Sequence, residues 1–309
     1  MFRGLENSVA EQIPDPFISL SDSDMRLCIN VLASCRPNYL YITLDGIFRN
    51  TVFAPDSPHK PDVNVYADII ASGESFADEI MEVASYFPVR EVYLAEKHKG
   101  IGYRFWESFT RAFDGFYDFC LYMEDDWLIT PTALKWLYDV PKIAAHYSVY
   151  RWQDRLDSDP ESEKYCHDGD GYTVFRDGRY LSWSVGFSKD SFDFIHRIVK
   201  SHALFGLYDR FISDWEMRRF MYTDWDKVLV PILKHYKLLS MMPPRSLLAH
   251  FGSKTTHQMG FAQDDLRRHE QMFAGDKSRW LDNVVELFNT TTAEEKAAIS
   301  WRPHSFRYE

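Results

Sequence analysis

The chain has 309 residues, of which 45% are hydrophobic and 16% aromatic, enough to bury a sizeable core in one large or two smaller domains. The formal net charge of −11 argues against tight, charge-driven binding to nucleic acid. No apolar run reaches the ~20 residues of a membrane span, and the start lacks a signal-peptide core. We therefore expect no transmembrane segment and a cytoplasmic location.

Residues 1–24 are polar and carry two prolines, which predicts an arm ahead of the folded domain. Residues 25–33 form an apolar run of strand length, and Ser34, Cys35 and Arg36 lead from it into a helix with an apolar face. This order is typical of the first unit of a nucleotide-binding α/β sheet. The chain contains neither GxGxxG nor GxxxxGK[ST], so neither a dinucleotide cofactor nor a P-loop is expected.

Three further strand–helix alternations follow before residue 140. Ser75 and Asp78 predict a capping box at the start of the second helix. A glycine-bearing loop at 96–102 leads into the third helix, which carries phenylalanines four residues apart. The fold class predicted is α/β, with a doubly wound, mostly parallel central sheet flanked by helices. Its remaining strands are predicted at 63–70, 89–94 and 119–123.

Three carboxylates, Glu124, Asp125 and Asp126, directly follow the fourth predicted strand, and Thr130-Pro131 then predicts the start of a helix. In open α/β sheets, ligands bind at the carboxyl ends of the strands. Carboxylates packed together repel one another, and a hard divalent cation such as Mn²⁺ or Mg²⁺ relieves that repulsion. The cluster therefore predicts a metal site, and the alternative interpretation is a solvated acidic loop.

Beyond residue 150 the alternation weakens. No acidic residue occurs from Lys227 to Gln263, which predicts either a solvated basic face or a surface that faces phosphates. The elements predicted here are a long loop or lid at 154–171, a strand at 180–187, helices at 188–200 and 209–221, a strand or short helix within 228–239, and a helical tail from 263.

The order of these features resembles the GT-A glycosyltransferases, in particular the N-acetylglucosaminyltransferase I-like group. The likeness rests on residues 122–127 with Thr130-Pro131, on the lead-in around His98, Gly100 and Ile101, on residues 214–219, and on residues 251–254 with His257. It covers roughly residues 25–260. It implies a GT-A domain whose nucleotide-sugar-binding half spans 25–150 and whose acceptor-binding half spans 151–262. The arm at 1–24 precedes this domain, and a helical C-terminal extension at 263–309 follows it.

The resemblance implies a nucleotide-sugar donor, with a UDP-sugar as the expected form, and Mn²⁺ or Mg²⁺ as the cofactor. Asp126 is the implied direct metal ligand, and His257 or His250 completes the metal shell or binds a phosphate oxygen. Asp68 could instead cap a turn, and a lone histidine could be structural. The implied donor-binding residues are Ser34, Cys35, Arg36, Asp68, His98, Gly100, Arg104, Glu124, Asp125 and Lys254.

The acceptor hydroxyl needs a base, and the candidates are Asp214 first and Glu216 second. The named relatives have two adjacent acids before tryptophan, whereas Trp215 separates the two acids here. Asp214 could instead pair with Arg218 on the same helix face. A carboxylate base in line with the leaving group would give inversion at the anomeric carbon.

The function predicted is therefore metal-dependent, inverting transfer of a hexosyl or pentosyl group from a nucleotide sugar to an acceptor hydroxyl. The acceptor is a glycan, a lipid or a small molecule, and a hydroxymethylated DNA base is an alternative. A second hypothesis is a nucleotidyltransferase on a related sheet, although the turn at 34–37 lacks the glycine-rich basic loop of those enzymes. A third is a non-catalytic binding protein with the same fold.

Overall fold

The structure is a computed structural model of the whole chain. It describes residues 25–48, 61–69, 73, 75–129, 133–140, 142–149, 164–167, 172–175, 184–208, 210–222, 224–243 and 247–250. The predicted arm at 1–24 and the predicted helical extension at 263–309 lie outside these ranges.

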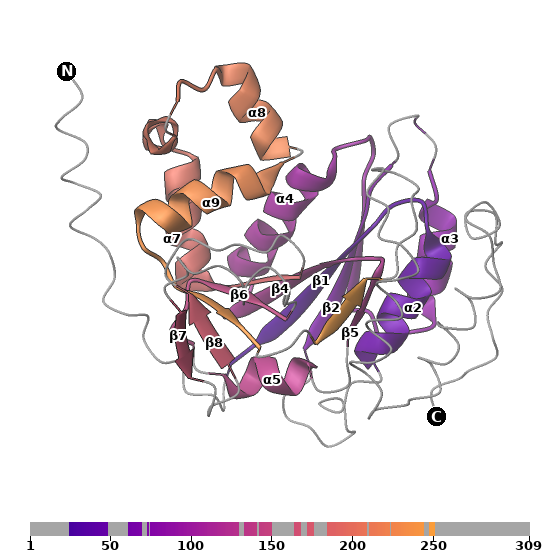
Figure 1. The fold of residues 1–309 in the computed structure, drawn as a ribbon. Helices are drawn as coiled ribbons and strands as arrows, with labels where there is room; N and C mark the ends of the chain where they lie inside the picture. The colour runs from indigo at the N-terminus through magenta and orange to yellow at the C-terminus, as the bar shows by residue number, and fades with distance from the viewer. Residues whose placement is uncertain are drawn as a thin grey trace.

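A nine-stranded sheet forms the centre of the described chain (Figure 1). Strands β1 to β4 run parallel, and β6, β7 and β10 share their direction, so only β9 and β8 run the opposite way. The predicted mostly parallel sheet is therefore confirmed. In spatial order the strands are β3 (Glu91–Leu94), β2 (Asp62–Ala67), β1 (Leu27–Ala33), β4 (Phe119–Glu124), β9 (Val185–Ser188), β6 (His146–Ser148), β10 (Ser240–Met242), β8 (Tyr172–Phe175) and β7 (Lys164–His167).

Helices cover both faces of the sheet, as Figure 1 shows, which confirms the predicted α/β class. Alternate residues of β1 face the two layers, because side chains of a strand alternate between its faces. Ile29 and Val31 join the core under α2 (Pro37–Phe48), α3 (Ala77–Ser85) and α5 (Ala133–Asp139). Cys28 and Leu32 join the core under α4 (Ile101–Asp114), α7 (Lys189–Val199), the short helix η3 (His202–Leu207), α8 (Asp214–Tyr222) and α9 (Trp225–His235).

Several elements differ from the sequence-based expectation. The predicted loop at 154–171 contains the strand β7, whereas at 228–239 the helical alternative is confirmed, because most of that segment belongs to helix α9. The predicted capping box is absent, since Phe76 is the N-cap of α3 and Ser75 accepts a hydrogen bond only from the backbone of Ala77. The short strands β5 (Trp127–Ile129), β6, β10 and β11 (Leu248–His250) were not predicted, because three residues are too few to show an alternating pattern.

Within the described ranges, no helix has both the length and the apolar character needed to cross a bilayer. The cysteines Cys28, Cys35 and Cys120 are free thiols, and two of them are buried in the sheet.

The start of α4 packs directly against the end of α8, and this contact depends on a glycine. A Cβ atom on Gly102 would lie 2.5 Å from the carbonyl carbon of Tyr222 and 2.6 Å from the carbonyl oxygen of Met221. Both are backbone atoms, so neither can swing away as a side chain would. The two helices therefore approach as closely as they do only because residue 102 has no side chain.

We expect Gly102→Ala to lower the free energy of unfolding by about 2–3 kcal/mol, since the added methyl group overpacks this contact. Urea denaturation measures the effect. Gly206→Ala is the matched control, because a Cβ there meets nothing within 4 Å. Equal stabilities of the two variants would contradict the close approach of α4 and α8.

Candidate functional site

The carboxyl ends of four neighbouring parallel strands meet at one edge of the sheet. In register, Ala33 of β1 lies beside Ala67 of β2, Ala67 lies beside Leu94 of β3, and Leu32 lies beside Glu124 of β4. The sequence places a polar segment immediately after three of these strands: Ser34–Arg36, Asp68 and Asp125–Asp126. The structure thus brings the predicted donor-binding residues of these three segments to a common edge, where open α/β sheets bind ligands.

The acidic residues form a tight turn between β4 and β5, and Arg36 pairs with two of them. Arg36 Nη2 bonds Asp125 Oδ1, and Nη1 lies 2.9 Å from Asp126 Oδ2. The two aspartate side chains are only 2% and 8% exposed, so they are not a solvated acidic loop. A backbone hydrogen bond from Ser34 also reaches Asp125. The turn after β1 therefore holds the turn after β4, and the prediction that residues 34–36 contact the donor remains a prediction.

Burial and mutual repulsion shift the protonation of this turn. Burial, together with the charge of Asp126, raises the pKa of Glu124 to about 8. Burial likewise raises the pKa of Asp125 to about 6, although the nearby charge of Arg36 opposes that rise. For Arg36 burial lowers the pKa, but the charges of Asp125 and Asp126 outweigh it, so the net shift is upward and the guanidinium stays charged. Buried carboxylates that repel one another in this way favour the binding of a further cation, which stabilises their ionised form.

Thr43, on α2, fixes the backbone of the acidic turn from behind. Its buried hydroxyl lies 2.7 Å from the carbonyl oxygen of Asp125 and 3.0 Å from that of Trp127. The sequence analysis missed this residue, since a lone threonine on a helix carries no motif. Its contact orients the carboxylates without touching them.

We expect Thr43→Val to lower the free energy of unfolding by about 1–2 kcal/mol, because valine keeps the shape but leaves buried carbonyl oxygens without their donor. Guanidinium denaturation measures the loss. Thr43→Ser retains the hydroxyl and serves as the control. If both variants lost the same stability, the hydroxyl would not be what holds the turn.

A strand from near the end of the described chain lies beside the acidic turn. β11 pairs antiparallel with β5, and His250 is opposite Trp127 in the register. Trp127, the first residue of β5, directly follows the acidic turn. Because His250 is the last residue of β11 and lies opposite Trp127, β11 ends beside the acidic turn. Lys254 and His257 lie outside the described residues, so their predicted roles remain predictions.

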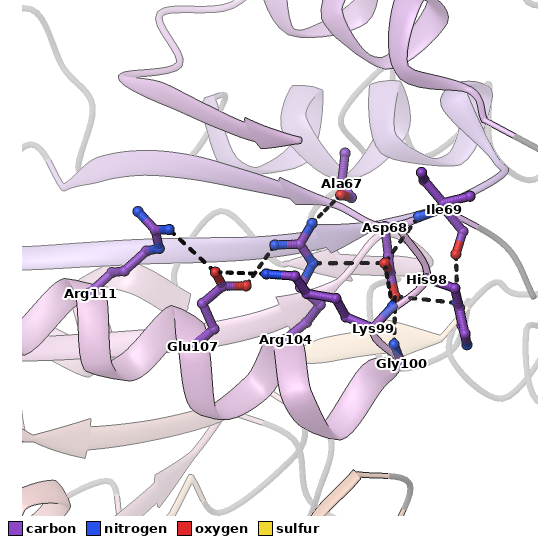
Figure 2. Close-up of polar contacts among 9 residues, drawn as sticks. All are labelled: Ala67, Asp68, Ile69, His98, Lys99, Gly100, Arg104, Glu107 and Arg111. Atoms are coloured by element: carbon purple, nitrogen blue, oxygen red, sulfur yellow. Dashed lines mark hydrogen bonds and ion pairs between the residues drawn. The ribbon is translucent and has the colours of Figure 1, made fainter. Parts of the chain in front are cut away.

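Asp68 stabilises the loop after β3 (Figure 2). Its carboxylate accepts hydrogen bonds from the backbone N–H groups of Ile69, Lys99 and Gly100, at 3.0, 3.1 and 2.8 Å. Gly100 has a φ of +83°, a conformation that suits glycine. His98 Nδ1 lies 2.6 Å from the carbonyl oxygen of Ile69. These contacts agree with the alternative role predicted for Asp68, in which its side chain caps a turn.

Arg104 lies buried behind this loop, at 1% exposure, rather than on the surface of the site. Its Nη2 donates to the carbonyl oxygen of Ala67 at 2.5 Å, and its Nη1 donates to Glu107 Oε2 at 2.6 Å. Glu107 also accepts hydrogen bonds from the side chains of Lys99 and Arg111, as Figure 2 shows. Sequence reasoning missed Glu107, although its spacing of three residues from Arg104 on one helix was a readable signal.

The two candidate bases differ in their surroundings. Glu216 forms a capping box with Ser213: Ser213 N–H donates to Oε2 at 3.1 Å, and Glu216 N–H donates to Ser213 Oγ at 3.2 Å. Glu216 also pairs with Arg210, and these bonds lower its pKa, which makes it a poor proton acceptor. Asp214 is exposed at the start of α8, and the described contacts include no ion pair with Arg218.

The start of α8 is also displaced from the edge of the sheet. The nine residues of α8 span ~12 Å, and its last residue, Tyr222, is the one that meets α4. α8 packs against α4 and α9, on the side of the sheet opposite to α2 and α3 (Figure 1). None of the hydrogen bonds or ion pairs described joins Asp214 to the acidic turn.

The acidic turn suits a divalent ion that arrives with substrate oxygens. Among the described residues, no group of three or more His, Cys, Asp and Glu side chains is arranged to hold a metal ion by itself. Asp125 Oδ2, however, is buried and accepts no hydrogen bond from the described chain. Mg²⁺ and Mn²⁺ take oxygen ligands, and Mg²⁺ commonly uses one or two carboxylates plus phosphate oxygens. Asp125 and Asp126 fit that requirement.

Comparison with protein-family models gave no match, and no curated protein matched the sequence. Solved structures gave three informative similarities. The first is TarS from S. aureus in complex with UDP-GlcNAc, which is 12% identical, with 85% of this chain and 71% of that chain covered and a TM-score of 0.43. The second is a putative nucleotide-diphospho-sugar transferase from Desulfovibrio desulfuricans, 13% identical, covering 86% and 99%, with a TM-score of 0.46.

The third is the mannosyltransferase PcManGT from Pyrobaculum calidifontis in complex with GDP-Man and Mn²⁺, which is 13% identical, covers 96% of this chain and 77% of that chain, and has a TM-score of 0.43. TM-scores below 0.5 do not define a family.

Proposed function

We propose that the chain is a metal-dependent, inverting glycosyltransferase of the GT-A type, which transfers a sugar from a nucleotide-sugar donor to an acceptor hydroxyl. The observation that supports this most is the pair of buried carboxylates, Asp125 and Asp126, at the carboxyl ends of β1 and β4. These two buried acids, both paired with Arg36, supply carboxylate oxygens of the kind that a hard divalent ion binds.

In this proposal Asp126 and Asp125 hold Mn²⁺ or Mg²⁺ together with the donor diphosphate. The ion would supply Lewis-acid stabilisation of the negative charge that develops on the leaving phosphate. Thr43 keeps the carboxylates oriented, and the loop at 98–100, held by Asp68, borders the nucleotide. The segment after His250 starts beside the acidic turn, so Lys254 and His257 are proposed to meet the diphosphate.

Asp214 is the proposed base, because its carboxylate has no described partner, whereas that of Glu216 caps a helix. It would accept the proton of the acceptor hydroxyl as the new glycosidic bond forms. This role requires the start of α8 to lie within hydrogen-bond reach of the attacking hydroxyl when donor and acceptor are bound. The donor is proposed to be a UDP-sugar carrying a hexosyl or pentosyl group.

A thermal-shift screen of nucleotide sugars, with and without Mn²⁺, tests the proposal. A donor that binds only the folded state raises the melting temperature, and a donor at a hundred times its dissociation constant adds about 2.7 kcal/mol. We expect UDP-sugars to raise the melting temperature only when Mn²⁺ is present. A chain whose melting temperature responds to none of these pairs would not be a nucleotide-sugar enzyme.

A further inference from the structure

Arg36 pairs with the two carboxylates that a divalent ion would use. Its two terminal nitrogens bond one oxygen of Asp125 and one of Asp126, and its guanidinium carbon lies 5.0 Å from the ring centre of Tyr39. The two carboxylates are almost completely buried, while the Arg36 side chain is 19% exposed. Arg36 is therefore the most exposed member of this pairing.

Arg36 and a divalent ion would share the same two carboxylates, so the two cations would lie close together. Arg36 already takes Asp125 Oδ1 and Asp126 Oδ2, and Asp125 Oδ2 is the buried oxygen that stays without a hydrogen bond in the described chain. A cation bound to these oxygens would also lie within a few ångströms of the guanidinium charge, where like charges repel strongly in a poorly solvated site.

We propose that Arg36 is a built-in counter-cation of the acidic turn, which competes with the divalent metal ion for Asp125 and Asp126. The inference rests on the proposed function for the identity of the ion. In the absence of metal, Arg36 neutralises the buried carboxylates and holds the turn in shape. Metal binding requires Arg36 to give up part of this pairing, so the affinity for metal alone is kept low.

Arginine suits this role because a guanidinium binds carboxylate and phosphate oxygens equally well with two parallel hydrogen bonds. Stacking on Tyr39 keeps the guanidinium plane in place while its partners change. A similar pair at the opposite end of the same two strands, Arg26 with Asp118, has an arginine that is 56% exposed. That pair offers a matched control, since it lies at the far end of β1 and β4.

The test is the dissociation constant of Mn²⁺ alone, measured by titration calorimetry for the parent, Arg36→Met and Arg26→Met. We expect Arg36→Met to bind Mn²⁺ about tenfold more tightly than the parent, a coupling of ordinary size between two ligands of one protein. Arg26→Met should match the parent. An Arg36→Met variant that binds Mn²⁺ no more tightly, or more weakly, overturns the proposal.

Should Arg36→Met fail to fold, Arg36→Lys carries the same test. Lysine keeps the charge but cannot form both parallel bonds, so a smaller gain in Mn²⁺ affinity, about twofold, is expected. No gain in this variant would also overturn the proposal. Repeating the titrations in the presence of UDP tests the proposed function separately. If UDP does not bind, the Mn²⁺ affinities of the parent and the variants can still be compared.

Discussion

Asp126→Asn should reduce the metal-dependent release of nucleoside diphosphate from the donor by about a hundred- to a thousandfold, the cost of removing one strong stabiliser of developing charge. The asparagine keeps the size of the side chain but has lost the negative charge that a hard cation needs. The expected loss is in turnover, which is measured as nucleoside diphosphate released per enzyme at saturating Mn²⁺.

The matched control for this variant is Asp139→Asn. Asp139 is 58% exposed at the end of α5 and pairs with Lys135, so its loss removes an acid without affecting the site. Its turnover should equal that of the parent. If Asp126→Asn, shown to be folded by its unfolding curve, kept the parent's turnover, the acidic turn would not be the metal site.

Arg104→Met should lower the free energy of unfolding at neutral pH by about 3–5 kcal/mol, because it breaks a buried ion pair and leaves a carboxylate behind. The carbonyl oxygen of Ala67 also loses its donor, so the end of β2 loosens. Arg111→Met is the control. Arg111 contacts the same Glu107 but is 51% exposed, and its loss should cost about 0.5 kcal/mol or less.

The effect of Arg104→Met should depend on pH. Burial raises the pKa of Glu107, but hydrogen bonding and charge from Arg104 and Lys99 outweigh that, and the net shift is downward. A carboxyl group with a lowered pKa stabilises the fold above its unfolded pKa, which is about 4.3 for glutamate, and that stability is lost as the pH falls through the folded value. The difference in the free energy of unfolding between parent and Arg104→Met should therefore have its full size at pH 7 and become smaller below about pH 4.

If the difference in unfolding free energy between parent and Arg104→Met stayed constant down to pH 3, Arg104 would act only through packing and its hydrogen bond to the carbonyl oxygen of Ala67. Denaturant titrations at pH 3, 5 and 7 distinguish these outcomes, with Arg111→Met measured in parallel at each pH.

The first half of the fold was predictable because its signals are local. The apolar strands β1 and β4 and the helices α2 and α4 show their periodicity within a few turns of sequence, and the acids after β4 mark the edge where ligands bind. Ser34 and Arg36 lie near the acidic turn because β1 and β4 are parallel neighbours, whose carboxyl ends share one edge.

The contacts made inside the site were not predictable. That Arg36 pairs with Asp125 and Asp126 depends on side-chain directions that no local pattern encodes. The same holds for Asp68, whose carboxylate accepts hydrogen bonds from three backbone N–H groups. Strands of three residues, such as β5 and β11, exist because a distant partner supplies their hydrogen bonds, so composition alone does not reveal them.

The pairing of β5 with β11 has a consequence for the growing chain. β5 begins at Trp127, yet its only partner in their two-stranded sheet ends at His250, more than a hundred residues later. A nascent polypeptide released from the ribosome before that point would carry the acids after β4 without the strand that pairs with β5. The two-stranded sheet beside the acidic turn therefore forms only late in synthesis, after the strand at 248–250 has emerged.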